Sequence, residues 1–416
     1  MGDYRLDTRG TFFQYEVMKH RPTYMIKTSS SFASMHVMLL CLLTACAGAP
    51  DVPVDAPAES ESSAPPPPPA AAEKPGPREI TVAAVGDMML GTDYPENHLP
   101  DDDGVGFLLD VAPVLAAADL TFGNLEGVLV DGGTPRKVCA NPAACFLFRS
   151  PSRYVEHFVR AGFDVLSLAN NHSRDFGEEG RSETMRILDD AGIAHSGRAG
   201  DFATLDVNGV RVAVLGFAVT QQSNLMHDYE AAAEIVMDHA ATYDIVVVSF
   251  HGGAEGNDVT RLPFAEEEYF GEPRGDVVYF ARKMVDAGAD LLIGHGPHVV
   301  RAMERYENRL IAYSLGNFAT YYGISVHGLN GIAPILQVTL DEEGQFIEGQ
   351  IYSIMQIRPG GPTRDRSRRA LRLIRDLSHE DFGTPGIRFL DNGRILPDTR
   401  PTVREHAPEP AGGRQR

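Results

Sequence analysis

Side chains able to bind a metal ion follow apolar segments at five places in this 416-residue chain. Asp87, for example, comes one glycine after the apolar run 80–85, and His251 comes directly after the apolar run 245–250. In open α/β sheets the carboxyl ends of the strands face one crevice, so we expect groups placed at strand ends to converge. The candidate residues at the five positions are Asp87, then Asn124 and Glu126, then Asn171 and His172, then His251 and Glu255, and finally His295 and His298.

The chemical types in this set indicate a divalent metal centre. Imidazole, carboxylate and amide oxygen together suit Mn, Zn or Fe better than Mg or Ca alone, and we expect one or two ions. Each motif alone has a simpler interpretation: Asp87 could lie in a turn, Asn171 in a loop that caps a helix, and His251 in the core. Their joint occurrence at five strand ends favours one shared site over coincidence.

The segments that position these residues alternate between buried strands and helices. Asn208-Gly209 between two apolar runs is a strong type I′ hairpin signal, and later hairpins are expected to turn at Glu307-Asn308 and Glu343-Gly344. The alternation predicts an α/β sheet to which the hairpins add antiparallel strands. The expected strands are 80–85, 120–122, 165–169, 245–250 and 291–293, and the expected helices are 107–118, 151–162, 179–192, 277–287 and 367–377.

The N-terminal region has the order of a lipoprotein signal peptide. A basic stretch from Lys19 to Lys27 precedes the apolar run 37–43, which is too short for a bilayer span of about 20 residues but suits a signal peptide. The run ends in Leu-Thr-Ala-Cys, which resembles a bacterial lipobox with Cys46 as the lipidated residue. The alternative is a chance cysteine after an ordinary signal. We expect an exported protein, lipid-anchored on the periplasmic or surface face of the bacterial envelope.

Composition divides the chain into five parts. We expect a signal peptide over 1–45, a Pro/Ala-rich linker over 46–77, one domain over 78–357, a C-terminal extension with a helix over 358–399, and a disordered tail over 400–416. The linker can bury little apolar surface and its prolines hold it extended, so it is typical of a stalk. A proline-rich ligand for a partner module is the competing interpretation.

Two cysteines of the expected domain lie close together in sequence. Cys139 and Cys145 flank a short loop that contains Asn141-Pro142. An oxidising compartment and a short loop favour a local disulfide. A metal-ligand role would need further cysteines or a paired histidine nearby, and the loop supplies none.

The chain is strongly acidic, with a formal net charge of −20. This charge argues against a nucleic-acid partner, because binding to phosphates needs a basic face. An acidic surface also repels a polyanion, so an acidic polymer substrate would need a local basic or metallic site.

Six short motifs carry the candidate residues in a fixed order over roughly residues 79–357. The motifs are Gly86-Asp87-Met88-Met89-Leu90-Gly91; Gly123-Asn124-Leu125-Glu126; Leu168-Ala169-Asn170-Asn171-His172 with Asp175 and Gly177; His251-Gly252-Gly253 with Glu255; Gly294-His295-Gly296-Pro297-His298-Val299; and Tyr313-Ser314-Leu315-Gly316-Asn317-Phe318. As an ordered set they resemble the poly-γ-glutamate capsule-biosynthesis protein CapA family.

The resemblance implies the fold of calcineurin-like metallophosphoesterases, a four-layer α/β/β/α sandwich with two mixed sheets between outer helices. It implies that His172 is an outer-sphere acid, with Asp175 orienting His172 or capping the next helix. It also implies that Asn124, Glu255 and Asn317 face the substrate. The implied metal ligands are Asp87, Glu126, Asn171, His251, His295 and His298, and an ion held there would acidify a bound water for attack on a phosphate ester or an amide.

The sequence departs from the related patterns at two points. The phosphoesterase pattern has a histidine two residues after its first aspartate, where this chain has Met89, which would weaken one metal position. Aromatic residues common around the His-x-Gly-x-Glu segment are replaced by Gly252 and Gly256, which changes the expected pocket wall.

These observations support three hypotheses about function. The first is an envelope-anchored CapA-like metal-dependent hydrolase in the synthesis, export or processing of an extracellular acidic polymer such as poly-γ-glutamate, working with capsule-synthesis proteins. The second is a general metal-dependent phosphoesterase acting on phosphate-containing substrates. The third is a non-catalytic scaffold of a capsule machine, in which the metal site serves only structure.

Overall fold

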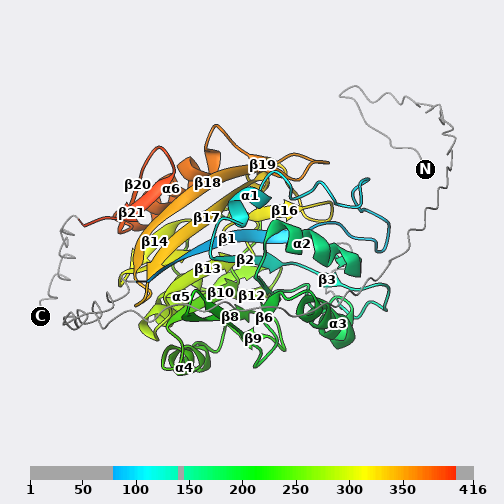
Figure 1. Cartoon of the computed structure of the whole chain (residues 1–416), viewed down its shortest axis with the longest axis horizontal. Helices are drawn as coiled ribbons and strands as arrows, with labels where there is room; N and C mark the ends of the chain where they lie inside the picture. The colour runs from blue at the N-terminus through cyan, green and yellow to red at the C-terminus, as the bar shows by residue number, and fades with distance from the viewer. Residues whose placement is uncertain (1–77, 139–144, 400–416) are drawn as a thin grey trace, which may run out of the picture. The chain divides into compact units, whose positions relative to one another are not determined.

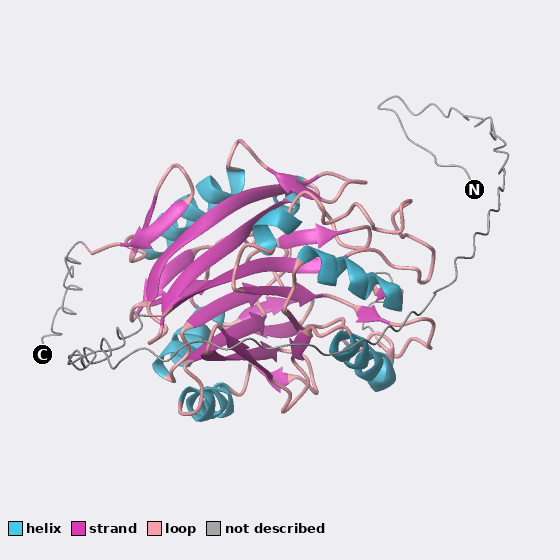
Figure 2. Cartoon of the chain, viewed as in Figure 1, coloured by secondary structure: helices cyan, strands magenta, loops and turns pink. Residues whose placement is uncertain are grey.

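Two large β-sheets form the centre of the part of the chain that the computed structural model describes, which is residues 78–138 and 145–399 (Figures 1 and 2). The larger sheet has ten strands in the order β20-β21-β18-β17-β1-β2-β5-β6, with β16 beside β1 and β19 beside β18. Its strands are β1 (Glu79–Met89), β2 (Leu120–Leu125), β5 (Val165–Ser167), β6 (Ala194–Ser196), β16 (Asn317–Thr320), β17 (Ile332–Asp341), β18 (Phe346–Gln356), β19 (Pro362–Arg364), β20 (Ile387–Phe389) and β21 (Arg394–Pro397).

The smaller sheet has seven strands in the order β14-β15-β13-β10-β8-β7, with β9 beside β8. Its strands are β7 (Ala203–Val207), β8 (Val210–Ala218), β9 (Asn224–Leu225), β10 (Ile245–His251), β13 (Leu291–His295), β14 (Met303–Tyr306) and β15 (Arg309–Ala312). Two short strand pairs lie outside the sheets, β3 (Val128–Leu129) with β4 (Arg149–Ser150), and β11 (Glu267–Tyr269) with β12 (Glu272–Gly275).

Three apolar clusters define four layers. One cluster joins side chains of both sheets, such as Val82 of β1 and Val247 of β10, and therefore lies between the sheets. A second packs the other face of the larger sheet against α1 (Ala112–Leu115), α2 (Val155–Ala161) and α3 (Gly177–Asp190). A third packs the other face of the smaller sheet against α4 (Tyr229–Ala240) and α5 (Val277–Asp286). The α/β/β/α architecture predicted from the sequence is confirmed.

Parallel pairing in each sheet brings the ends of its central strands to one edge. In the larger sheet β1, β2, β5 and β6 pair in parallel, and in the smaller sheet β8, β10, β13 and β15 do so. The register places Asp87 beside Asn124 and His251 beside His295. The chain therefore aligns polar residues that are distant in sequence at the carboxyl ends of neighbouring strands.

Two glycines let the backbones pack closely at this edge. A Cβ on Gly86, just before Asp87, would lie 1.9 Å from the Gly316 carbonyl oxygen, and one on Gly294, just before His295, would lie 2.2 Å from the Tyr313 carbonyl oxygen. Any larger residue at these positions would push the strands apart.

The three expected hairpins form, with Val207 opposite Val210 at the first turn. The helix expected over 107–118 is much shorter in the structure, where α1 covers only Ala112–Leu115. Pro113 has no N–H for an α-helical hydrogen bond. The residues before α1 form successive turns instead, one of them closed by a hydrogen bond from Phe107 N to Gly104 O. Helix α4 was not predicted, although Asp228 caps it by accepting a bond from Ala231 N.

Residues 358–399 add to the same layers. Strand β21 pairs with β18, and α6 (Arg369–Phe382) contributes Leu371 and Ile374 to the cluster between the sheets. Among the described residues, no helix is both long and apolar enough to cross a membrane. Cys46 and Cys139 lie outside the described residues, as do the expected signal peptide, linker and tail, whereas Cys145 is described and is disulfide-bonded.

Candidate metal centre

Asp87 is the centre of a buried polar cluster at the aligned strand ends. Its side chain is fully buried. Asp87 Oδ1 accepts a hydrogen bond of 2.9 Å from Asn124 Nδ2 and lies 3.3 Å from His295 Nδ1. Asp87 Oδ2 lies 3.0 Å from His298 Nδ1. The carboxylate thus links β1 of the larger sheet to the end of β13 in the smaller sheet.

Glu126 brings a second carboxylate to the same place. Glu126 Oε1 lies 3.3 Å from His251 Nε2 and 3.8 Å from His298 Nε2, and Glu255 Oε2 also lies 3.8 Å from His298 Nε2. One ligand atom from each of Asp87, Glu126 and His298 lies within 4.8 Å of the others, a separation suited to one metal ion. The larger sheet supplies oxygen donors to this cluster, and the smaller sheet supplies the imidazoles.

The unpaired atoms of the cluster fit a cation. Several candidate ligands have buried side-chain atoms without a hydrogen-bond partner among the described residues, such as Glu126 Oε2, Asn171 Oδ1, His251 Nδ1 and His295 Nε2. Buried polar atoms are nearly always paired, so this group of unpaired atoms calls for a missing partner. A divalent ion bound by oxygen and imidazole nitrogen supplies that partner.

The electrostatics of the cluster also favour a positive charge. Burial raises the pKa of Glu126 to about 7 and lowers the pKa of His251 to about 3, since both lose the hydration of their charged forms. Burial alone would lower the pKa of His298, but the carboxylates of Glu126, Asp87 and Glu255 outweigh it and raise that pKa to about 10. Carboxylates that hold a proton on His298 would stabilise a cation in the same place.

The pKa of Asp87 is shifted the other way. Burial alone would raise the pKa of Asp87, but contacts with His295 and His298 outweigh this and lower it. Asp87 is therefore the carboxylate of this cluster that stays ionised most readily, as a metal ligand must.

His172 and Asp175 form a hydrogen-bonded pair beside this cluster. His172 Nδ1 lies 2.8 Å from Asp175 Oδ2, which also accepts a 2.7 Å bond from Phe148 N. The Phe148 ring stacks on the His172 ring at 4.1 Å, and Lys137 Nζ lies 3.2 Å from both His172 Nδ1 and Asp175 Oδ1. An Nδ1–H donated to Asp175 leaves Nε2 as the ring nitrogen for proton transfer.

Comparison with known proteins identifies the family. The family model "Bacterial capsule synthesis protein PGA_cap" matches residues 81–322, more than half of the chain. The chain belongs to this family. The CapA resemblance inferred from the motifs is thereby confirmed, and the segment that matches the family model is called the PGA_cap region below.

Two relatives carry capsule names. The chain is 30% identical over 263 residues to the capsule biosynthesis protein CapA of Bacillus anthracis, covering 58% of this chain and 59% of that protein. It is 30% identical over 256 residues to the PGA biosynthesis protein CapA of Bacillus subtilis, covering 58% of this chain and 63% of that protein. The chain thus spans about three fifths of the length of these relatives.

Among solved structures, a purple acid phosphatase from yellow lupin matches with a TM-score of 0.33 and 11% identity, over 73% of this chain and 56% of that one. GAP50, the anchor in the inner membrane complex of Plasmodium, matches with a TM-score of 0.31 and 12% identity, over 72% of this chain and 95% of that one.

Asparagines of the PGA_cap region hold the cluster in place. Asn124 is fully engaged within the protein, because its Nδ2 donates to Asp87 and its Oδ1 accepts a 3.0 Å bond from Asn170 Nδ2. Asn170 also accepts from His172 N, so one asparagine connects the Asp87 side to the His172 side. Asn317, beside Asp87 in the sheet, donates to Ser325 O and has a buried, unpaired Oδ1.

Met89 does not face this polar cluster as a ligand. Its side chain packs with Phe148 and Ile324 in a small apolar cluster. Since Phe148 stacks on His172, Met89 contributes to the support of that histidine. At the position where the phosphoesterase pattern has a histidine, this chain therefore has an apolar side chain that packs in the protein interior.

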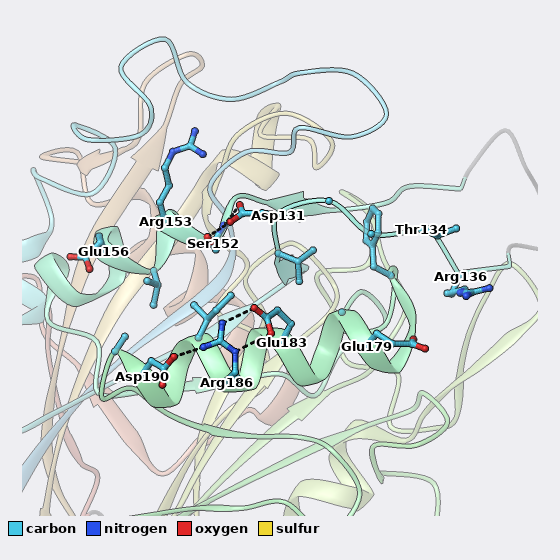
Figure 3. Close-up of a pocket in the computed structure, with 18 residues that line it drawn as sticks. Asp131, Thr134, Arg136, Ser152, Arg153, Glu156, Glu179, Glu183, Arg186 and Asp190 are labelled. Carbon is cyan, nitrogen blue, oxygen red and sulfur yellow. Dashed lines mark hydrogen bonds and ion pairs between the residues drawn. The ribbon is translucent and has the colours of Figure 1, made fainter.

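A cleft of about 680 Å³ adjoins the cluster and is lined by Asn171, His172 and Glu255. A second cavity, of about 800 Å³, lies along α3 (Figure 3), and none of the described residues that line it is a predicted metal ligand. There Arg186 is held between Glu183 and Asp190 on the same helix. The cleft beside His172 is therefore the one that a substrate of the candidate centre would enter.

Three residues at the site were missed from the sequence. Asn170 lies inside a recognised motif, but its role depends on a hydrogen bond to Asn124, which is 46 residues away in the sequence. Such a contact cannot be recognised from the sequence around Asn170. Lys137 lies two residues before Cys139, and the sequence around it does not indicate a contact with His172. Arg274 lines the cleft from β12, in a strand pair whose sequence shows no clear alternation.

Proposed function

We propose that this chain is an envelope-anchored, metal-dependent hydrolase that acts in the synthesis, export or processing of an extracellular acidic polymer such as poly-γ-glutamate. The capsule names of its relatives support the polymer, and the working partners would be capsule-synthesis proteins. The observation that carries the proposal is the meeting of Asp87, Glu126 and His298 beside the His172–Asp175 pair at one cleft.

Each residue has an assigned role in this proposal. Asn124 positions Asp87, which differs from the substrate contact expected from the resemblance, and Asn317 keeps its site-facing role. His172 would act in its imidazolium form, donating the Nε2 proton to the leaving oxygen, while Asp175 accepts from Nδ1–H and orients the ring. A bound divalent ion would polarise the scissile group and supply an acidic water. The residues that would hold the ion are Asp87, Glu126, Asn171, His251, His295 and His298.

Turnover by the purified protein tests the hydrolase proposal. We expect Mn²⁺, Zn²⁺ or Fe²⁺ to bind in a ratio of one or two ions per chain, and the loaded protein to cleave γ-linked oligoglutamate. Metal content is measured by mass spectrometry, and cleavage by chromatography of the products. Stoichiometric metal binding without cleavage of any tested substrate would favour the non-catalytic scaffold instead.

A general phosphoesterase is the second candidate function. The pairing of His172 with Asp175 favours it, because protonation of a leaving oxygen is what a phosphate ester requires. The packing of Met89 in an apolar cluster counts against a full two-metal phosphatase. Faster turnover of phosphodiesters or phosphomonoesters than of oligoglutamate would establish this alternative.

The anchor is tested at Cys46. We expect Cys46→Ser to release the protein from the membrane fraction of its bacterial host, because serine cannot carry the thioether-linked lipid. Fractionation followed by immunoblotting measures the change, and Cys41→Ser, on a cysteine inside the expected signal peptide, is the matched control. Equal membrane association of both variants would rule out the lipid anchor.

A further inference from the structure

Positive charge is concentrated in the cleft beside the candidate metal centre. The chain as a whole has a formal net charge of −20. The cleft nevertheless has five cationic side chains among its lining residues and only two acidic ones, Glu255 and Glu272. The cationic residues are Arg136, Lys137, Arg174, Arg181 and Arg274. A basic hollow on an acidic protein concentrates anions from solution.

The cavity along α3 provides an internal comparison. It is the larger of the two, but five acidic residues line it against three arginines. Its charges also pair with one another, as Arg186 does with Glu183 and Asp190 (Figure 3). Cations of the cleft pair too, Lys137 with Asp175 and Arg181 with Glu178, but neither of these carboxylates lines the cleft. The lining of the cleft therefore keeps an excess of positive charge that the cavity along α3 lacks.

Two polar atoms that can donate a hydrogen bond lack a partner in the cleft. Among the described residues, the buried atoms Thr220 Oγ1 and Arg181 Nε have none, and both residues line the cleft. Unpaired buried polar atoms are costly, so a group of them at one cleft indicates a site that a polar ligand completes. The free donors, combined with the positive charge, suit an anionic ligand.

Arg274 is the cationic residue best held for this purpose. Its side chain is only 2% exposed, its Nε donates a 3.1 Å bond to Gly253 O, and its guanidinium lies 5.9 Å from the centre of the Tyr269 ring. These contacts fix the guanidinium at the cleft wall. Because a guanidinium has five donor hydrogens, donors remain for the oxygens of a ligand.

Glu255 shows how an anionic group fits between Arg274 and the metal centre. Glu255 Oε1 lies 2.9 Å from Arg274 Nη2, and Glu255 Oε2 lies 3.8 Å from His298 Nε2. One carboxylate of the protein thus spans the distance from the arginine to a candidate metal ligand. A carboxylate or phosphate oxygen on a substrate that reaches the metal centre would come within reach of the same guanidinium.

We propose that the cleft is an anion-binding subsite in which Arg274 selects substrates that carry a carboxylate or a phosphate beside the group held at the metal centre. This inference rests on the proposed function, because it takes the metal centre as the place where the substrate reacts. It assigns recognition of the substrate to Arg274, which Glu255 positions. It also explains how a strongly acidic protein can take up a polyanion.

The test measures binding to the full-length protein before any turnover. The first variant is Arg274→Gln. Because it leaves the Glu255 carboxylate without its arginine partner and could fold poorly, the second variant combines Arg274→Gln with Glu255→Gln. The matched control is Arg153→Gln, which removes the same charge at the cavity along α3. The probes are a decamer of glutamate, a neutral decamer of glutamine and inorganic phosphate, each titrated by calorimetry.

We expect both Arg274 variants to weaken binding of the anionic probe by about tenfold or more, because a charge-assisted hydrogen bond is lost. Arg153→Gln should leave this affinity unchanged, and the glutamine decamer should bind all forms equally weakly. Loss of affinity for the glutamate decamer alone identifies a carboxylate subsite, and loss for phosphate identifies a phosphate subsite. Equal affinity of the wild type and both Arg274 variants for both anions would overturn the inference.

Metal content, measured on the same samples, separates this inference from the proposed function. If the protein holds no metal and cleaves no substrate, the hydrolase proposal fails. Anion binding that still depends on Arg274 would then support the subsite by itself. For a protein that does cleave, Arg274→Gln should raise KM for an anionic substrate more than it lowers kcat. A fall in kcat alone would contradict a role in substrate recognition.

Discussion

Asp87→Asn is expected to lower the affinity of the protein for its divalent ion by about 100-fold or more and to abolish turnover, because even partners outside the ligand shell contribute 10- to 100-fold. Asparagine keeps the size of the side chain and one oxygen, but it loses the charge that lies between His295 and His298. The measurement is a metal titration followed by mass spectrometry of the dialysed protein.

A carboxylate elsewhere in the same sheet provides the control. Asp164 accepts a hydrogen bond from Thr121 N and lies away from the candidate ligands in the register of the strands. Asp164 is only partly buried, and Asp164→Asn should keep full metal content. A loss seen only in Asp87→Asn therefore cannot come from the general effect of replacing a hydrogen-bonded carboxylate next to a strand of this sheet. Full metal content in Asp87→Asn would remove Asp87 from the ligand set.

The pKa values of the cluster give the sign of the pH dependence of metal affinity. His298, with its pKa raised to about 10, and Glu126, with its pKa raised to about 7, both hold protons at low pH, and an ion must displace them. Affinity for the ion should therefore rise as the pH increases from 6 to 8, and the titration of the wild-type protein at both values checks this.

His172→Asn is expected to lower kcat by about 10²- to 10⁴-fold while the metal stays bound, since general acid catalysis contributes a factor of that size. The side chain bonds to Asp175, and its ring stacks on Phe148 rather than on a candidate ligand. Asp175→Asn should lower kcat in the same direction, because it no longer fixes the tautomer of the imidazole. Kinetics and metal analysis on the same preparations make the measurement.

The chain contains a matched histidine for this experiment. His195 on β6 is also buried and also pairs with a carboxylate, with its Nδ1 3.0 Å from Asp201 Oδ2. His195→Asn removes an equivalent pair that lies outside the candidate site, so kcat should be unchanged. If His172→Asn and His195→Asn reduce kcat equally, the loss reflects folding and not proton transfer.

The positions of the candidate ligands could be predicted from sequence because each follows an apolar strand in the chain. His251 and His295 end two parallel neighbours, so their approach follows from the topology alone. The role of Asn124 could not be predicted, because an asparagine at a strand end can face a ligand or bond to an adjacent strand. Its bond to Asp87 is visible only in the fold.

Residues on irregular segments were harder to predict for a different reason. Arg274 reaches the cleft from a two-strand element, and nothing in the periodicity of that segment separates a buried arginine from a solvated one. Helix α4 was not predicted, although its Asp228 cap and the alanines that follow are favourable helix signals. Local patterns predicted the strands well, whereas contacts across the fold decided which polar groups meet.

The division of donors between the two sheets has a mechanical consequence. Asp87 and Glu126 come from one sheet, and His251, His295 and His298 come from the other, so the ion would act as a clasp between the two halves of the sandwich. Neither half holds the full set of donors, so a shift of one half relative to the other would separate the carboxylates from the imidazoles. The apolar side chains packed between the halves, such as Val247, are thus part of what sets the affinity of a site that they never touch.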